Sequence, residues 1–495
     1  MIIKILRNSL FLLSGQILAK LLTLLCFIFL ARRLGVEGFG FYGTVMTYLT
    51  LFATFADVGM STVTIREVAQ DHARSNQYFT HVLTLRIIVT AGLYACLVAL
   101  GGLWQSPRYP VAFVAGCGLF LFPEAIRKSG RAMLSAYERM DLISILEVVS
   151  TIFRYIPFFI VILSGKSLYT AFFLLVLSWI ITAGMWLVIT MRYCLPQRMS
   201  YSLDIQELRK ILQASYPFAI LAILSVIYFK IDISMLAYMQ GDEAVGFYEG
   251  AYKFIEAAFF IPVSIVNVLL PAMSRSFATD KVSYENLYVH ATRILTIGML
   301  PVAVLVTFFS KEIILLVLKE PYLPSVPALS VLIWALFFMF VNAPVGNIIA
   351  TSRKIHAFLP YAIANTLFNV VLNVFLIPRY SFLGAAVATV LSEVLAFAIQ
   401  LYFAHRILGN AASVLRMLTA VLLAGGCASM VFYSINPYVI LPLKILAFLA
   451  IYVGGLFVVK AIRHEDIHLF HTILSIAKTK IQSKTAHGTH GKTRK

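Results

Sequence analysis

The chain has few charged side chains. Only 13% of its 495 residues are Asp, Glu, Lys or Arg, whereas a soluble domain uses these residues for about a quarter of its length. Hydrophobic residues make up 60% of the chain, and the mean hydropathy is +0.88. This composition excludes an ordinary soluble protein and predicts an all-α polytopic membrane protein.

Cysteine is also scarce. The five cysteines are Cys26, Cys96, Cys117, Cys194 and Cys427, and all lie in or beside hydrophobic segments. Their spacing matches neither a disulfide framework nor a zinc site. We therefore expect no metal and no bound cofactor.

Long polar loops are missing as well. About 14 segments are apolar over the roughly 20 residues that a membrane helix needs, and no loop between them exceeds about 20 residues. A membrane polymerase or lipid-dependent glycosyltransferase commonly carries its catalytic groups on a long external loop. The sequence therefore argues against an enzyme.

The basic residues follow the predicted topology. With the N-terminus inside, about 27 Lys and Arg fall in cytoplasmic segments and about 7 outside. Both termini are thus predicted to be cytoplasmic in a multi-pass protein. The formal net charge of +18 is explained by this topology, without nucleic acid as a partner.

A repeat links the two halves of the chain. The stretch LARRLGVEGFGFYG from Leu30 aligns without gaps with LAYMQGDEAVGFYEG from Leu236. Identical residues include the pairs Gly35 and Gly241, Glu37 and Glu243, Gly40 and Gly246, Phe41 and Phe247, and Tyr42 and Tyr248. Six predicted spans separate the copies, so both copies cross the bilayer in the same direction, as in transporters built from parallel repeats.

The repeat predicts the domain organisation. Residues 1–200 would form an N-lobe of six helices and residues 201–410 a C-lobe of six helices. Residues 411–462 would add a helix pair, and residues 463–495 a basic cytoplasmic tail.

Ionisable residues inside predicted spans mark the candidate site, because such groups are costly in a bilayer and are usually paired or functional. Lys230 and Asp232 lie near the outer end of the seventh span, and Glu249, Lys253 and Glu256 share one face of the eighth. Two interpretations stay open. The first is a set of ion pairs, Asp232 with Lys253 and Lys230 with Glu249 or Glu256; the second is a cavity face that contacts an anionic substrate or couples to ions.

Other polar residues extend this candidate site. We predict that substrate contacts come from cations and amides, and that ion coupling or ion pairing involves acidic residues. The substrate set is Lys20, Arg154, Lys230, Lys253, Asn365, Asn369 and Asn373, and the acidic set is Glu147, Asp232, Glu249, Glu256 and Glu393. The three asparagines could instead bond helices together, and Arg86 is expected to extend to the membrane surface.

Several stretches resemble one family. ARRLGVEGFGFYGTVMTYLTLFATFADVGMS, AYERMDLI, IDISMLAYMQGDEAVGFYEGAYK and LNVFLIPRYSFLGAAVATVLSE are similar to polysaccharide transporters, the lipid-linked oligosaccharide (O-antigen-type) flippases of the MATE-like MOP exporter superfamily. Ser381 departs from this pattern, because the family usually has Gly there. The last two predicted spans fit the 14-helix branch.

The resemblance implies a V-shaped pair of six-helix bundles that alternates between two open states in a bacterial or archaeal cytoplasmic membrane. Its cargo would be a polyprenyl-diphosphate-linked oligosaccharide for surface polysaccharide biosynthesis, driven by a proton or sodium gradient and passed to polymerase machinery. Membrane lipids would surround it. A multidrug/cation antiporter of the same fold and a peptidoglycan-precursor flippase remain alternatives.

Overall fold

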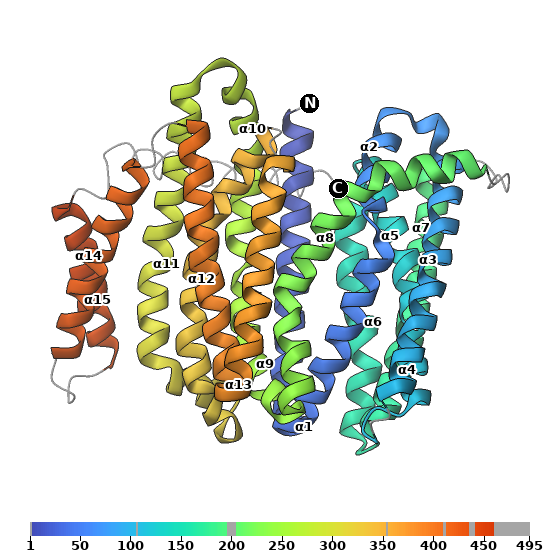
Figure 1. Ribbon diagram of the computed structural model, residues 1–495, viewed down its shortest axis with the longest axis horizontal. Coiled ribbons are helices and arrows are strands. Elements are labelled where there is room, and N and C mark those ends of the chain that lie inside the picture. Colours follow the sequence, from blue (N-terminus) through green and yellow to red (C-terminus); the bar gives the residue numbers. More distant parts are fainter. Residues whose placement is uncertain are drawn as a thin grey trace, which may run out of the picture. The chain divides into compact units, whose positions relative to one another are not determined.

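The computed structural model describes residues 2–104, 107–195, 204–352, 355–408, 412–434 and 441–459. Over these ranges the chain is helical and contains no strand. The α-helices are α1 (Ile2–Asp57), α2 (Met60–Gln70), α3 (Ser75–Trp104), α4 (Val111–Gly118), α5 (Leu121–Ala136), α6 (Met140–Leu163), α7 (Leu168–Cys194), α8 (Ile205–Gln240), α9 (Asp242–Ala258), α10 (Phe260–Thr279), α11 (Lys281–Val317), α12 (Val326–Thr351), α13 (Ile355–Leu408), α14 (Ala412–Ser434) and α15 (Leu441–Val458). Two short 3₁₀ helices, η1 (His72–Arg74) and η2 (Glu320–Ser325), complete the set (Figure 1).

The predicted fold class is confirmed. Within the described ranges, nine helical segments are long and apolar enough to cross a membrane. The helices α1 and α13 each contain two predicted spans, because each is interrupted by a sharp break, at Gly35 and Ser381 respectively. The total of 14 crossings stays a prediction.

The two copies of the repeat turn in the same way. Gly35 has φ 70° and ψ −179°, and Gly241 has φ 84° and ψ 179°. This combination of dihedral angles is essentially restricted to glycine. The glycine conserved between the copies therefore sets the turn in both hairpins.

A proline bends another long helix, α8. Figure 1 shows that α8 begins as a segment lying across its neighbours and then bends. Pro217 lies inside this helix, where it removes a backbone donor and clashes with the preceding turn. The bend is the expected consequence.

The chain divides into two compact units. The first comprises Met1–Phe260, Ser310–Leu332 and His356–Leu395, and the second comprises Ile261–Phe309, Ile333–Ile355 and Ala396–Lys495. These units do not follow the predicted lobes at 1–200 and 201–410, whose division stays a prediction. The predicted tail, 463–495, lies outside the described residues.

In the first unit, a core between α2, α3, α5 and α7 is built from large apolar side chains. Phe79, Met133 and Trp186 are at most 1% exposed. The Trp186 indole donates a hydrogen bond of 3.1 Å to Ser150 Oγ, so its polar atom is satisfied inside the core. This core packs α2, α3, α5 and α7 against one another.

In the second unit, α14 and α15 pack against each other. Gly455 lies so close to Ala424 that an added Cβ would be 3.2 Å from the alanine methyl group. Tyr452 of α15 donates a hydrogen bond of 2.9 Å to the carbonyl oxygen of Ile297 in α11. The predicted final helix pair is thus joined to α11.

Candidate functional site

The site begins where the two repeat copies meet. An added Cβ at Gly40 would collide with the carbonyl oxygen of Asp242, and one at Gly246 would collide with the carbonyl oxygen of Val36. Gly246 is the counterpart of Gly40 in the repeat, and Asp242 is the counterpart of Val36. The contact is therefore reciprocal, as at a two-fold axis, and we call these four residues the hairpin seam.

One side of the hairpin seam is held by the connection between α3 and α4. Arg108 Nε lies 2.5 Å from Asp242 Oδ2, and Arg108 Nη1 lies 2.6 Å from Glu37 Oε1. The hydroxyls of Tyr109 and Thr44 donate hydrogen bonds of 2.6 and 2.8 Å to Asp242 Oδ1. Asp242 is only 4% exposed, so its carboxylate is enclosed by these partners.

These contacts shift two titratable groups outside the spans. Burial acts to lower the pKa of Arg108, but the hydrogen bond to Glu37 and the charge of Asp242 outweigh it and raise the pKa. Burial, followed by the charge of Asp242 and the hydrogen bond to it, raises the pKa of Tyr109. Arg108 therefore stays charged and Tyr109 stays protonated at neutral pH, so both can donate to Asp242.

The opposite side of the hairpin seam has a comparable tyrosine. Tyr322 of η2 donates to the carbonyl oxygens of Ala31 at 3.1 Å and Gly35 at 3.2 Å. Arg32 donates two bonds of 2.7 Å to the carbonyls of Leu316 and Val317. Each hairpin is thus bound by side chains from outside the repeat: the first by Tyr322, and the second by Arg108 and Tyr109.

Deeper along α8 and α9 lie four ionisable side chains that we call the seam ion cluster: Lys230, Glu249, Lys253 and Glu256. Lys253 Nζ lies 2.8 Å from both Glu249 Oε2 and Glu256 Oε2, and Lys230 Nζ lies 3.8 Å from Glu256 Oε1. Of the two predicted partners of Lys230, Glu249 and Glu256, the structure pairs it with Glu256. Lys253 also lies 4.2 Å from the centre of the Phe27 ring in α1, so the cluster reaches the first repeat copy.

The predicted pair of Asp232 with Lys253 is wrong. Asp232 instead accepts a hydrogen bond from the Tyr248 hydroxyl, which also lies 3.3 Å from Thr389 Oγ1 in α13. Asp232 is 3% exposed, and the Lys253 ammonium group pairs instead with Glu249 and Glu256, which lie one turn away on its own helix. Nearby, Tyr228 donates a hydrogen bond of 2.9 Å to Glu393 Oε1.

The three asparagines of α13 are buried, at 8%, 2% and 0% exposure for Asn365, Asn369 and Asn373. Asn369 donates a bond of 3.1 Å to Ser392 Oγ, and Asn373 donates one of 3.1 Å to Asn369 Oδ1. Hydrogen bonding between helices is confirmed for Asn369, whose partner Ser392 lies beyond the break at Ser381, whereas Asn373 bonds within its own segment of α13. Their contact with substrate stays a prediction.

The predicted residues of α6 lie in a different setting. Glu147 Oε1 accepts bonds from Arg127 and Arg131 of α5, at 3.0 and 2.9 Å. Arg154 lies 5.5 Å from the Trp179 ring centre, and its Nε is buried without a hydrogen-bond partner among the described residues. Glu147 thus belongs to an ion network with α5, and the charge of Arg154 acts on Glu124 of the same network.

The expectation for Arg86 is wrong. Its side chain is fully buried, where it pairs with Asp57 at 2.5 Å and donates to Ser129 and Ser61. Partners on α1, α2 and α5 bind both terminal nitrogens of the guanidinium inside the protein, so the side chain does not extend to the surface.

Lys20 of α1 is exposed, and its charge acts on Glu256 of α9. The structure therefore brings Lys20, Lys230, Lys253, Glu249 and Glu256 into one region. Arg108, Tyr109 and Asp242 were missed by the sequence analysis. Only the position of Asp242 beside the turn glycine could have suggested its importance. Among the described residues, no group of His, Cys, Asp or Glu could hold a metal ion.

Comparisons with known proteins decide the family. The sequence model of the family described as "Polysaccharide biosynthesis protein" matches residues 5–277, more than half of the chain. The chain belongs to this family. The predicted membership of the polysaccharide transporters is thereby confirmed. The MatE family model also matches residues 217–375 of the chain.

Individual relatives agree with this family. The "Capsular polysaccharide biosynthesis protein CapF" of Staphylococcus aureus is 23% identical over 408 residues, covering 81% of this chain and 99% of CapF. The "Lipid II flippase MurJ" in an inward closed conformation superposes with a TM-score of 0.72 at 12% identity, covering 89% of this chain and 97% of that one. An outward-facing multidrug resistance MATE transporter of the MOP superfamily gives 0.60 at 16% identity, covering 82% and 95%. The chain therefore has the MurJ- and MATE-like fold and is a multi-pass membrane protein.

Proposed function

We propose that the protein moves a polyprenyl-diphosphate-linked oligosaccharide across the cytoplasmic membrane by alternating access, for surface polysaccharide assembly. The family and the full-length similarity to a capsular polysaccharide biosynthesis protein support the pathway. The fold shared with a lipid II flippase supports the transport of a lipid-linked glycan. Polymerase machinery would receive the product.

The seam ion cluster carries this proposal. Lys230 and Lys253 are 15% and 12% exposed in their side chains, and Lys20 is exposed. An anionic diphosphate would compete with Glu249 and Glu256 for the two lysines, since charge-assisted bonds to phosphate oxygens resemble those to carboxylates. When the cargo leaves, the ion pairs between the glutamates and the lysines would form again, and the site would return to its unliganded state.

The hairpin seam supports alternating access. The two repeat copies touch there through backbone atoms, and Asp242 and Gly35 are bound by side chains of the α3–α4 connection and η2. With the predicted orientation, this seam lies at the outer end. Release to the outside would require these contacts to separate.

Two buried carboxylates support coupling to a gradient. Asp232 and Glu393 each accept a bond from a tyrosine on the spans that carry the seam ion cluster. Protonation or sodium binding at either carboxylate would change the charge of a buried region. Such a change has a large effect on the free energy of the conformation, because charges are costly to bury. We propose that a proton or sodium gradient drives transport, and a flipping rate that ionophores leave unchanged would contradict this.

A multidrug/cation antiporter is the second candidate. The MatE model covers the segment that holds Asp232, Glu249 and Glu256, and these carboxylates, the first two of them buried, would suit a cationic substrate. A peptidoglycan-precursor flippase differs from the main proposal only in the glycan. Drug-resistance assays and rescue of cells depleted of their own precursor flippase separate these cases.

The test is complementation of cells that lack their own oligosaccharide flippase. Wild type, Lys230→Ala, Lys253→Ala and Arg154→Ala are scored for surface polysaccharide and for accumulated lipid-linked precursor. Lys210→Ala is the matched control, because Lys210 lies on α8 like Lys230 but is 67% exposed and pairs only with Glu207.

Rescue by wild type and Lys210→Ala, with precursor retained when either seam lysine is removed at normal protein level, is the expected result. Failure of wild type to rescue with any repeat unit, despite correct insertion, would contradict the proposal. Drug resistance in the same cells would then favour the antiporter.

A further inference from the structure

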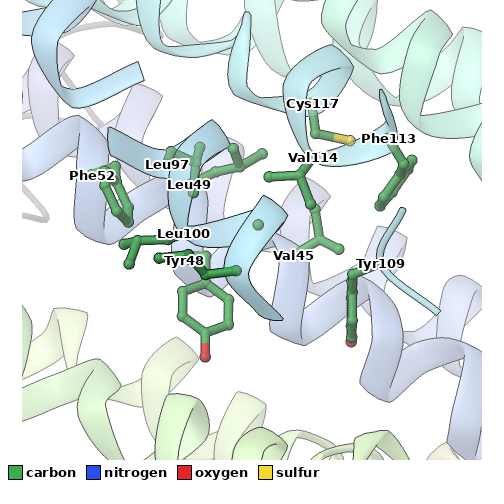
Figure 2. A pocket seen from close by; sticks show the side chains of 12 residues that line it. Val45, Tyr48, Leu49, Phe52, Leu97, Leu100, Tyr109, Phe113, Val114 and Cys117 are labelled. Atoms are coloured by element: carbon green, nitrogen blue, oxygen red, sulfur yellow. The ribbon is translucent and has the colours of Figure 1, made fainter. Parts of the chain in front are cut away.

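A cavity of about 400 Å³ lies beside the hairpin seam, and the functions above do not use it. It is walled by the second half of α1, the end of α3 and the start of α4. Leu49, Phe52, Leu97, Leu100 and Val114 line it (Figure 2). The volume lies in the range of about 300 to 1,000 Å³ that is usual for small-ligand sites.

The walls are hydrocarbon almost throughout. Figure 2 shows aliphatic and phenyl side chains on three sides, and the only polar atoms drawn are the hydroxyls of Tyr48 and Tyr109 and the sulfur of Cys117. A cavity of this composition does not hold water well, because water needs several polar partners. Its natural occupant is apolar.

The cavity is continuous with a surface suited to lipid. Leu100 and Leu103 line it and are 49% and 80% exposed, at the end of a helical segment apolar enough to span the membrane. These residues adjoin the α3–α4 connection, which the basic-residue distribution places outside. The cavity therefore lies at the depth of hydrocarbon chains in the outer leaflet.

One end of the cavity reaches the contacts of the hairpin seam. Tyr109 lines the cavity, and its hydroxyl donates a hydrogen bond to Asp242. Tyr48 also lines the cavity and interacts electrostatically with Asp242. Figure 2 shows both tyrosine hydroxyls pointing to the same side, away from Leu97 and Val114. An apolar ligand would pack on the ring of Tyr109 while its hydroxyl remains bonded to Asp242.

We propose that this cavity binds the hydrocarbon chain of a membrane lipid, and that the bound chain supports Tyr109 in its contact with Asp242. The occupant is a chain without a charged group, because Arg108 at that end already pairs with Glu37 and Asp242. The site is separate from the seam ion cluster. It would exist whichever cargo the protein moves.

The test is photolabelling of the purified full-length protein in nanodiscs. One sample contains phosphatidylglycerol with a diazirine in an acyl chain, and another contains a polyprenyl phosphate with a diazirine in its chain. Mass spectrometry maps the adducts. We expect adducts on residues 45–52, 97–103 and 113–117 well above those on the lipid-exposed face of α7, and the two samples tell acyl from isoprenoid occupants.

Variants that fill the cavity give the second measurement. Val45→Phe and Cys117→Phe approach from α1 and α4, and Ile180→Phe is the control because Ile180 is half exposed on α7. Each methylene that a filled cavity no longer buries weakens binding by about fourfold. Labelling of the cavity should therefore fall at least that much in both filled variants and stay unchanged in the control.

Thermal denaturation checks that the variants are folded and reports binding independently, since a ligand of the native state raises Tm. Added probe lipid should raise the Tm of wild type and Ile180→Phe but not of the filled variants. Cavity labelling no stronger than that of the α7 face would overturn the proposal, as would undiminished labelling in folded Val45→Phe and Cys117→Phe. If the labelling and Tm results are as expected but the protein does not transport the lipid-linked oligosaccharide, only the proposed function is contradicted, and the lipid site stands.

Discussion

The two repeat copies share a backbone but differ in chemistry. Their turn glycines, Gly35 and Gly241, have nearly the same φ and ψ, and their helices meet reciprocally at Gly40 and Gly246. The second copy has ionisable residues where the first has none. The pairs are Lys230 and Leu24, Asp232 and Cys26, Glu249 and Gly43, Lys253 and Thr47, and Glu256 and Thr50.

This difference follows from the symmetry. Residues near the axis face their own counterparts, so an added Cβ at Gly43 would lie 3.1 Å from Cγ of Glu249. Two glutamates at this position would repel each other in a place with little water. The first copy therefore has a small residue at this position, Gly43, and the second copy has the charged Glu249.

The largest effect is expected for Lys253→Met. It leaves Glu249, whose side chain is 2% exposed, without its lysine, and breaking a buried pair in this way costs about 3–5 kcal/mol. The counterpart change Thr47→Val removes one hydroxyl and should cost about 1 kcal/mol. Denaturation in detergent measures both. Adding Glu249→Gln to Lys253→Met should recover much of the loss, and an absent recovery would contradict the pairing.

Next come Gly40→Ala and Gly246→Ala. Each methyl group would collide with a backbone carbonyl of the other hairpin, so each should lower stability by about 3 kcal/mol, the upper end for overpacking. The reciprocal seam requires similar effects at both positions. Gly184→Ala is the control, because no atom lies within 4 Å of an added Cβ there. A clear difference in Tm between the two seam variants would break the symmetry.

A smaller effect is expected for Arg108→Ala, which removes one partner from the buried Asp242. Tyr109 and Thr44 remain, so the loss should be about 2 kcal/mol, within the range for a buried polar group that loses a partner. Glu37→Ala should cost under about 1 kcal/mol because Glu37 is 66% exposed. Equal Tm losses for the two variants would contradict the assignment of Asp242 as the buried member.

The smallest effect should be a gain. Lys319 has φ 72° and ψ −178°, nearly the dihedral angles of Gly35 and Gly241, without being glycine. Such backbone strain costs about 1–3 kcal/mol, so Lys319→Gly should stabilise the protein by about 1 kcal/mol after the added freedom of the unfolded glycine is included. Gly241→Lys is the opposite test and should lower Tm.

The sequence analysis succeeded where local patterns suffice. Apolar runs predicted the helices, and the matched glycines predicted equivalent hairpins. The polar face of the eighth span predicted Glu249 or Glu256 as the partner of Lys230, and the structure pairs it with Glu256. The depth of a residue along a helix does not show which way its side chain faces around the helix axis, however, so the partner of Asp232 was assigned wrongly. Tyr248 donates to Asp232, whereas Lys253 pairs with Glu249 and Glu256.

The sequence by itself determined an all-helical membrane protein, its family and the duplicated hairpin, because hydropathy, basic residues and glycines act over short distances along the chain. Only the tertiary structure decided which charges meet. Arg108 finds Asp242 and Arg86 is enclosed by Asp57 and Ser129 because packing brings distant segments together. A cavity, too, exists only between helices, so its lining could not be read from any single segment.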